Sequence, residues 1–110
     1  MLDIVYIMSK AKLVKNQPPV RKLFKQELVS LFVKFKSASQ VGRFLGDLLT
    51  PAEYNELALR WQIVKLLHKG LSIREVAYRL GVAIATVERG SRELKYSKNN
   101  GFNELLKNYV

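Results

Sequence analysis

The sequence predicts an all-α protein of about six helices, and three observations support this fold class. Apolar residues recur at spacings of three and four along most of the chain after residue 20. Two short stretches, "TPAE" and "SIRE", have the residue pattern that begins a helix. No stretch of useful length alternates strictly between apolar and polar residues, as a half-buried strand would.

Composition and charge narrow the class of protein. A chain of 110 residues with 48% hydrophobic and 25% charged residues is typical of one globular domain. Its net charge of +10 at pH 7 indicates a polyanionic partner, nucleic acid first and an acidic membrane surface second. The sequence has no cysteine and a single histidine, His68. It therefore excludes a disulfide framework and a cysteine-bound zinc, and leaves little for histidine chemistry.

The first 19 residues are predicted to form a basic, mobile arm, followed by one helical domain over residues 20–110. The opening "MLDIVYIM" lacks a basic region and is too short to span a bilayer or to read as a signal peptide. Met8 begins a stretch that reads like a second plausible start. Pro18 and Pro19 disfavour a helix and are expected to end the arm.

Residues 20–35 have a helical pattern with an unusually wide apolar stripe, because Val29 and Val33 extend it beyond what one neighbouring helix would cover. A wide stripe on a short chain predicts burial on two sides, which fits a dimer whose chains interlock. A second short helix is expected over residues 39–45, ended by Gly46.

The next helix is predicted over residues 52–69. Thr50 can cap its start, Pro51 suits the first helical position and Glu53 completes a capping box, while Gly70 follows as a stop. Its apolar face is expected to contain Tyr54, Leu57, Ala58, Trp61, Val64 and either Leu67 or His68. A last amphipathic helix is expected after the "SKNNG" turn, with Phe102, Leu105, Leu106 and Tyr109 on its apolar side.

Residues 72–95 are interpreted as a helix-turn-helix. Ser72 and Glu75 form a second predicted capping box, Ala77 is small where two helices cross, and Gly81 supplies the turn. The wedge between the helices is expected to contain Val76, Leu80, Val82 and Val87. The start of the second helix carries small side chains that suit close approach to a major groove, with free N–H groups facing phosphates. A plain helical hairpin is the alternative.

The motifs "LTP", "RxxIV", "SxRE", "LG", "IAT" and "RGS" fall in this order between residues 48 and 95. This segment resembles the core of the tryptophan repressor family. The resemblance implies six helices per chain, an intertwined homodimer, and a helix-turn-helix that reads double-stranded DNA. It also implies L-tryptophan as a corepressor bound beside that motif.

Site residues follow from the resemblance, position by position. Those implied to contact DNA are Arg74, Ala83, Ile84, Ala85, Thr86 and Glu88. Those implied to contact an effector are Leu49, Thr50, Arg60, Arg89, Gly90 and Glu93. In this scheme two arginines, Arg60 and Arg89, sandwich the indole ring, while Thr50 and Arg89 contact the carboxylate. Leu49 and Gly90 line the wall.

Three positions depart from the family pattern. Glu93 replaces a hydroxyl near the corepressor ammonium, Ala77 replaces a lysine, and Glu88 replaces a threonine. Glu93 could hold the ammonium through a charge-assisted bond, or pair internally and leave no effector. Ordinary i,i+4 ion pairs are the alternative for the arginines: Glu56 with Arg60, Glu88 with Arg92 and Arg89 with Glu93.

The leading hypothesis is a homodimeric, sequence-specific DNA-binding repressor, regulated by L-tryptophan or another aromatic amino acid and located in the cytoplasm at the nucleoid. The alternatives are an effector-independent regulator or architectural DNA-binding protein, and a non-catalytic protein-interaction module. An enzyme is not expected, because the sequence has no paired carboxylates, no Ser/His or Cys/His constellation and no phosphate-binding glycine loop. No metal or cofactor is expected, and no membrane partner.

Overall fold

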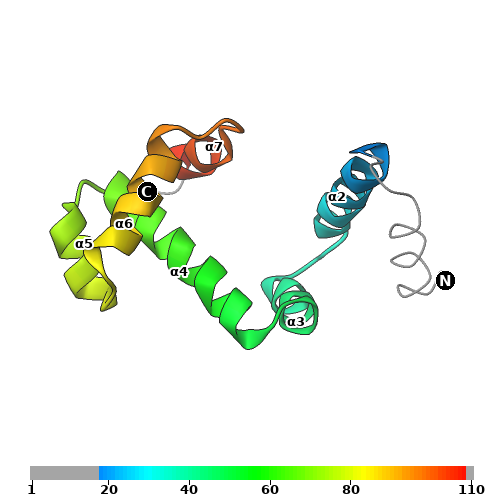
Figure 1. The fold of residues 1–110 in the computed structure, drawn as a ribbon. Helices are drawn as coiled ribbons and strands as arrows, with labels where there is room; N and C mark the ends of the chain where they lie inside the picture. Colours follow the sequence, from blue (N-terminus) through cyan, green and yellow to red (C-terminus); the bar gives the residue numbers. More distant parts are fainter. Residues whose placement is uncertain (1–17, 109–110) are drawn as a thin grey trace. The chain divides into compact units, whose positions relative to one another are not determined.

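The computed structural model describes residues 18–108, which form six α-helices and no strand (Figure 1). The helices are α2 (Pro18–Phe32), α3 (Ala38–Leu48), α4 (Pro51–His68), α5 (Ile73–Leu80), α6 (Ile84–Lys95) and α7 (Gly101–Lys107). The all-α prediction is confirmed. Except for Pro18 and Pro19, the predicted arm lies outside the described residues, as does Tyr109. The chain divides into two units, residues 1–45 and 46–110, which are described in turn.

In the first unit, α2 begins at Pro18, so the prediction that the two prolines disfavour a helix at this point is wrong. Proline is tolerated in a first helical turn because the N–H groups there have no partner within the helix. The helix ends at Phe32, three residues before the apolar stripe does. Beyond its end, the rings of Phe32, Phe35 and Phe44 pack together, with centroids 5.2–5.7 Å apart.

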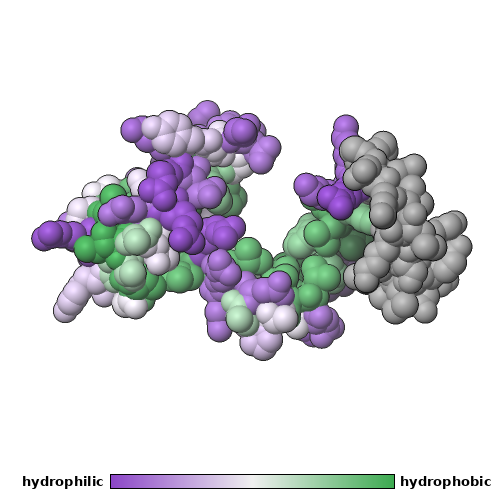
Figure 2. Space-filling model, viewed as in Figure 1, coloured by the Kyte–Doolittle hydropathy of each residue, from purple (hydrophilic) through white to green (hydrophobic). Residues whose placement is uncertain are grey.

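The apolar stripe of α2 is only partly covered. Leu23 is 61% exposed and Val29 66%, while Phe24 and Leu28 are each 39% exposed; Val33, just after the helix, is 85% exposed. Figure 2 shows apolar side chains at the surface over the C-terminal part of this helix. Burying each such side chain contributes roughly 1.5–3 kcal/mol, and the described chain leaves this stabilisation largely unused along the stripe.

Helix α3 continues through Gly46 to Leu48, so the prediction that Gly46 ends it is wrong. A glycine inside a helix costs only about 1 kcal/mol relative to alanine, and the helix ends instead just before the new start at Thr50. The described glycines with left-handed backbone are Gly70 and Gly81, which do follow the ends of helices.

In the second unit, α5 and α6 pack on α4 (Figure 1). The core contains Ile63, Val76, Ala77 and Val87, and seven partly buried residues pack around it: Leu59, Leu66, Leu67, Leu71, Ile73, Leu80 and Val82. A smaller contact joins α4 to α7, where Val64 and Leu106 are buried.

The predicted apolar face of α4 is partly wrong. Of its members Val64 is buried, but Leu57 is 44% exposed, Ala58 is exposed, and Trp61 and Tyr54 are half-buried. The side that packs on α6 includes Ile63 instead. Apolar residues surround most of α4, so periodicity alone did not identify the side that this chain covers.

Candidate nucleic-acid interface and effector pocket

The turn between α5 and α6 is held by local hydrogen bonds. Gly81 has left-handed backbone (φ +66°), which glycine adopts without steric cost. Its N–H donates to the Tyr78 carbonyl (3.3 Å), and the Val82 N–H donates to the Ala77 carbonyl (3.1 Å). These two bonds form a Schellman motif, which satisfies the last carbonyls of α5 and reverses the chain.

The start of α5 is capped, although not by the reciprocal box that was predicted. Ser72 Oγ accepts from the Glu75 N–H at 3.1 Å, as expected. The same hydroxyl also donates to Glu75 Oε1 at 3.1 Å, so this carboxylate does not return to the backbone of Ser72. One half of the predicted capping box is therefore confirmed and the other half is wrong.

The packing of the two helices agrees with a helix-turn-helix. Val76 and Val87 are fully buried between them and Ala77 is 6% exposed. Leu80 and Val82 pack at the edge of this wedge. The predicted wedge is confirmed.

The first turn of α6 is open to solvent. Ala83, Ile84 and Ala85 are all exposed, and Ile84 keeps 44% of its surface. Ala83 stands at the N-cap position, where no side chain accepts a hydrogen bond. The first N–H groups of a helix have no carbonyl partner within it, so this end presents uncapped donors beside small side chains.

Other residues predicted to contact DNA lie nearby on the same two helices. Arg74 is exposed in the first turn of α5, and Glu88 is exposed one turn into α6. Thr86 is half-buried and faces another side of α6, where it lines a pocket. The structure therefore leaves five of the six predicted contact residues exposed.

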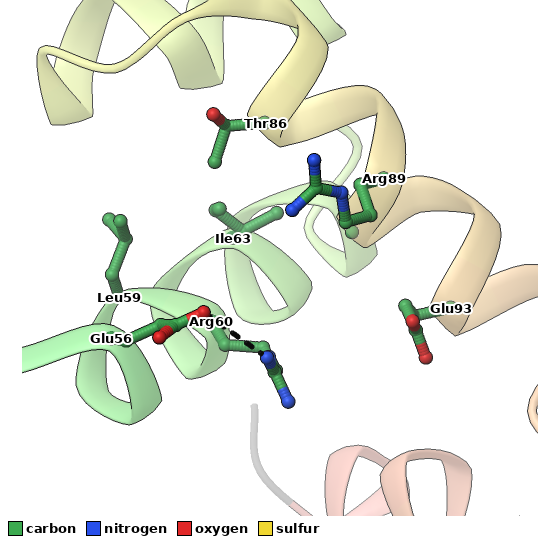
Figure 3. Close-up of a pocket in the computed structure, with 8 residues that line it drawn as sticks. Glu56, Leu59, Arg60, Ile63, Thr86, Arg89 and Glu93 are labelled. Carbon is green, nitrogen blue, oxygen red and sulfur yellow. Dashed lines mark ion pairs between the residues drawn. The ribbon is translucent and has the colours of Figure 1, made fainter. Parts of the chain in front are cut away.

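That pocket lies between α4 and α6 and has a volume of about 70 Å³ (Figure 3). Its lining residues are Glu56, Leu59, Arg60, Ile63, Thr86, Arg89, Gly90 and Glu93. Four residues predicted from the sequence to contact an effector are thus brought together: Arg60, Arg89, Gly90 and Glu93. Gly90 forms part of the closest approach of the two helices, because a Cβ there would lie 2.5 Å from Ile63 Cγ2.

Leu49 and Thr50 do not line this pocket. Thr50 instead caps α4: its N–H donates to Glu53 Oε1 (2.8 Å) and its Oγ1 accepts from the Glu53 N–H (3.2 Å). The Thr50 N–H that donates to the Glu53 carboxylate lowers the pKa of Glu53 most, and the Thr50 side chain lowers it further. Because Arg60 comes ten residues later, the two positions are about 15 Å apart along the helix.

The charges around the pocket are only partly paired. Arg60 Nη2 lies 3.6 Å from Glu56 Oε1, and this is the one ion pair within residues 18–108. Both side chains are more than half exposed, so the pair is worth about 0–1 kcal/mol and holds Arg60 only weakly. The alternative pairs, Arg89 with Glu93 and Glu88 with Arg92, do not form in this described part of the chain.

Comparison with known proteins identifies the family of this chain. The family model described as "Trp repressor protein" matches residues 24–109. The chain belongs to the Trp repressor family. A "Trp operon repressor homolog" of Vibrio parahaemolyticus is 41% identical over 83 residues, which cover 74% of this chain and 80% of the relative. A protein of the same name from Chlamydia caviae is 37% identical over 83 residues, covering 74% and 81%. No solved structure gave a match.

Membership has direct consequences for function. The family consists of transcriptional regulators that bind DNA and are not enzymes, so the chain is assigned as a DNA-binding repressor. In the described part of the chain, no group of three His, Asp or Glu side chains could hold a metal ion. No helix among residues 18–108 is long and apolar enough to cross a membrane.

The sequence reasoning missed some pocket residues of the Trp repressor fold. Glu56, Leu59 and Ile63 share one side of α4 with Arg60, as their spacings of three and four indicate. That spacing was the available signal. On the opposite side of α6 a broad hollow of about 400 Å³ was also missed; it is lined by Ile73, Glu88, Ser91, Arg92, Lys95 and Tyr96.

Proposed function

We propose that this protein binds specific DNA sequences as a homodimer, and that tryptophan or another aromatic amino acid regulates the binding. The observation that carries the DNA part is the open first turn of α6. Small exposed side chains at Ala83 and Ala85, with uncapped N–H donors beside them, suit entry into a major groove. The helix N-terminus favours the nearby phosphates.

Individual residues would have different roles on DNA. Arg74, exposed in the first turn of α5, contributes charge and contacts a phosphate or a base edge. Glu88 lies one turn further along the exposed side of α6, where its carboxylate can accept from a cytosine amino group. We therefore expect Glu88→Ala to change the base preferred at one position, and Arg74→Ala to weaken binding more evenly across sequences.

Two observations support a dimer. The apolar stripe of α2 is largely exposed: Leu23 and Val29 are each more than half accessible, as is Val33 directly after the helix. The effector pocket is also incomplete in one chain, because about 70 Å³ is well below the roughly 300–1,000 Å³ of typical ligand sites. If a second copy supplied its Leu49 and Thr50, it would close the pocket and bring together all six residues of the predicted effector site. Two α6 helices about 34 Å apart would then meet successive major grooves.

The pocket has the chemistry expected for an aromatic amino acid. Leu59, Ile63 and Gly90 supply an apolar floor, while Arg60 from α4 and Arg89 from α6 lie at its sides (Figure 3). Guanidinium planes stack on aromatic rings, and Arg89 is free of ion pairs in the described chain, so it can also receive a carboxylate. Since α6 contributes residues both to the pocket and to the proposed DNA contact, a ligand in the pocket can favour one position of that helix.

An effector-independent repressor is the second candidate, because Arg60 already has an ion-pair partner in Glu56 without any ligand. Selection of binding sites from random duplexes, with and without L-tryptophan, distinguishes the two. We expect a pseudo-palindromic consensus and tighter binding with tryptophan. Equal affinity with and without ligand, together with no heat in isothermal titration, would favour the second candidate. Selection that returned no preferred sequence would contradict specific reading by α6.

Light scattering on the purified protein tests the dimer separately. Twice the chain mass is expected at micromolar concentration. Val29→Glu, on the exposed stripe of α2, should shift the protein toward monomer, whereas Gln26→Glu, in the polar gap between Val29 and Leu23, should have a smaller effect. A monomeric wild-type protein would contradict the proposed assembly.

A further inference from the structure

Two pairs of oppositely charged residues line the pocket, one pair on α4 and one on α6, and only one of them forms an ion pair within the described residues. On α4, Glu56 and Arg60 are one turn apart and form an ion pair at 3.6 Å. On α6, Arg89 and Glu93 have the same i,i+4 spacing, yet they form no ion pair within the described residues. The pocket therefore has one free guanidinium and one free carboxylate, both on α6.

Glu93 is also poorly placed to stabilise its own helix. It lies in the last turn of α6, which ends at Lys95. The C-terminal end of a helix carries partial negative charge, so an acidic side chain there is unfavourable. With no ion-pair partner and no hydrogen bond in the described chain, Glu93 contributes little to folding. Its carboxylate is available for a ligand.

The complement of this free pair is a molecule with one carboxylate and one ammonium group. Arg89 can pair with the carboxylate and Glu93 with the ammonium. A ligand that has the carboxylate but no ammonium would bring a second negative charge close to Glu93 without compensation. At a polar, uncharged side chain the same ligand would meet no such repulsion, so the identity of residue 93 decides between the two ligand classes.

We propose that Glu93 is the specificity residue for the ammonium group, and restricts the pocket to zwitterionic amino acids with a flat apolar side chain. Deaminated acids of the same shape are rejected. This inference rests on the proposed regulation by an aromatic amino acid and sharpens it. A pocket with a hydroxyl in place of the Glu93 carboxylate would not discriminate against the deaminated acids in this way.

Isothermal titration of the full chain with two probes tests the inference. L-Tryptophan and indole-3-propionate share the indole ring and the carboxylate, and only the first has an ammonium group. We expect the wild-type protein to bind L-tryptophan at least about tenfold more tightly, since hydrogen bonds to charged groups are worth that much or more. In Glu93→Gln the ratio should fall to within about threefold, through weaker tryptophan binding and stronger indole-3-propionate binding.

Two further variants make the test decisive. Glu93→Ser should behave as Glu93→Gln does, since both remove the charge. Glu104→Gln removes a matched exposed carboxylate on α7, outside the pocket, and should leave the ratio unchanged. Circular dichroism checks that all variants are folded, as exposed positions predict.

The outcomes separate the two claims. Equal binding of both probes to the wild-type protein, or a tenfold ratio that persists in Glu93→Gln, overturns the role of Glu93 and leaves regulation by tryptophan intact. No binding of either probe by a wild-type protein that still binds DNA overturns the proposed regulation, and the role of Glu93 with it.

Discussion

The starts of α4 and α6 belong to the same unit but are built in opposite ways. At the start of α4, Thr50 and Glu53 exchange hydrogen bonds of 2.8 and 3.2 Å, so both of their N–H groups are bonded, and Pro51 has no N–H. At the start of α6, Ala83 stands at the N-cap with no side-chain hydrogen bond. The start of α4 is capped by a side chain, whereas no side chain accepts from the first N–H groups of α6.

This difference separates a structural helix start from one that is open for binding. An alanine at the N-cap costs about 1 kcal/mol relative to serine or aspartate, so α6 is less stable at its start than it could be. Its position depends on its middle, where Val87 is fully buried and Gly90 lies against Ile63. The packed middle allows the first turn to keep only small side chains and free N–H groups.

Adding a charged cap to α6 is expected to have the largest effect. Ala83→Asp should stabilise folding by about 0.5–2 kcal/mol, because the carboxylate accepts from the first N–H groups. It should weaken DNA binding about 30- to 150-fold, or about 2–3 kcal/mol summed over the two α6 helices of the proposed dimer. The added carboxylate repels phosphate and occupies the N–H groups at the start of α6. Urea unfolding and fluorescence anisotropy measure the two changes.

Ala83→Ser is the matched control for that variant. It caps the helix without charge, so it should stabilise folding similarly and lose much less DNA affinity. If Ala83→Asp bound DNA as tightly as the wild-type protein, the open first turn of α6 would not be the DNA-binding end.

Filling the close contact between α4 and α6 should have the next largest effect. Gly90→Ala places a Cβ about 2.5 Å from Ile63 Cγ2 and should destabilise the protein by about 1–2 kcal/mol. Gly46→Ala is the matched control in a helix: beyond its chain neighbours and its own helix backbone, no heavy atom lies within 4 Å of its added Cβ, so it should stabilise by up to about 1 kcal/mol. Equal effects of the two, measured by urea unfolding, would contradict the dependence of α6 on its packed middle.

Removing the cap of α4 should cost somewhat less. Thr50→Ala breaks both the side-chain acceptor and the geometry of the capping box, and should lower the free energy of unfolding by about 1 kcal/mol. Thr50→Ser keeps the hydroxyl and should change it little. An unchanged free energy of unfolding in Thr50→Ala would show that the capping hydrogen bonds do not stabilise the start of α4 relative to that of α6.

The smallest effect concerns pH. Hydrogen bonds from Thr50 lower the pKa of Glu53 below its ordinary value of 4.5. A carboxylate with a lowered pKa in the folded state stabilises the protein above its unfolded pKa, and this contribution is lost as the pH falls from about 4.5 through the folded value. In urea unfolding between pH 6 and pH 3, Glu53→Gln should therefore lose part of the wild-type pH dependence. Identical pH profiles would argue against the capping box in solution.

The sequence by itself determined the helices that have local start and stop signals. Thr50, Ser72 and Gly81 act on backbone groups within a few residues of themselves, so α4, α5 and the turn before α6 follow from them directly. The wedge of Val76 and Val87 followed from helical spacing. Where the local signal was ambiguous the predictions failed: Pro18 begins a helix, and Gly46 lies inside one.

Only the tertiary structure decided which side chains share the pocket. Glu56, Leu59 and Ile63 meet Arg89 and Glu93 because α4 and α6 cross at Gly90, and a crossing point depends on packing rather than on local signals. The tertiary structure also decided which ion pairs form. Three i,i+4 pairs were equally consistent with the sequence, and only Glu56 with Arg60 forms within the described chain, because rotamers and neighbouring helices select among such pairs.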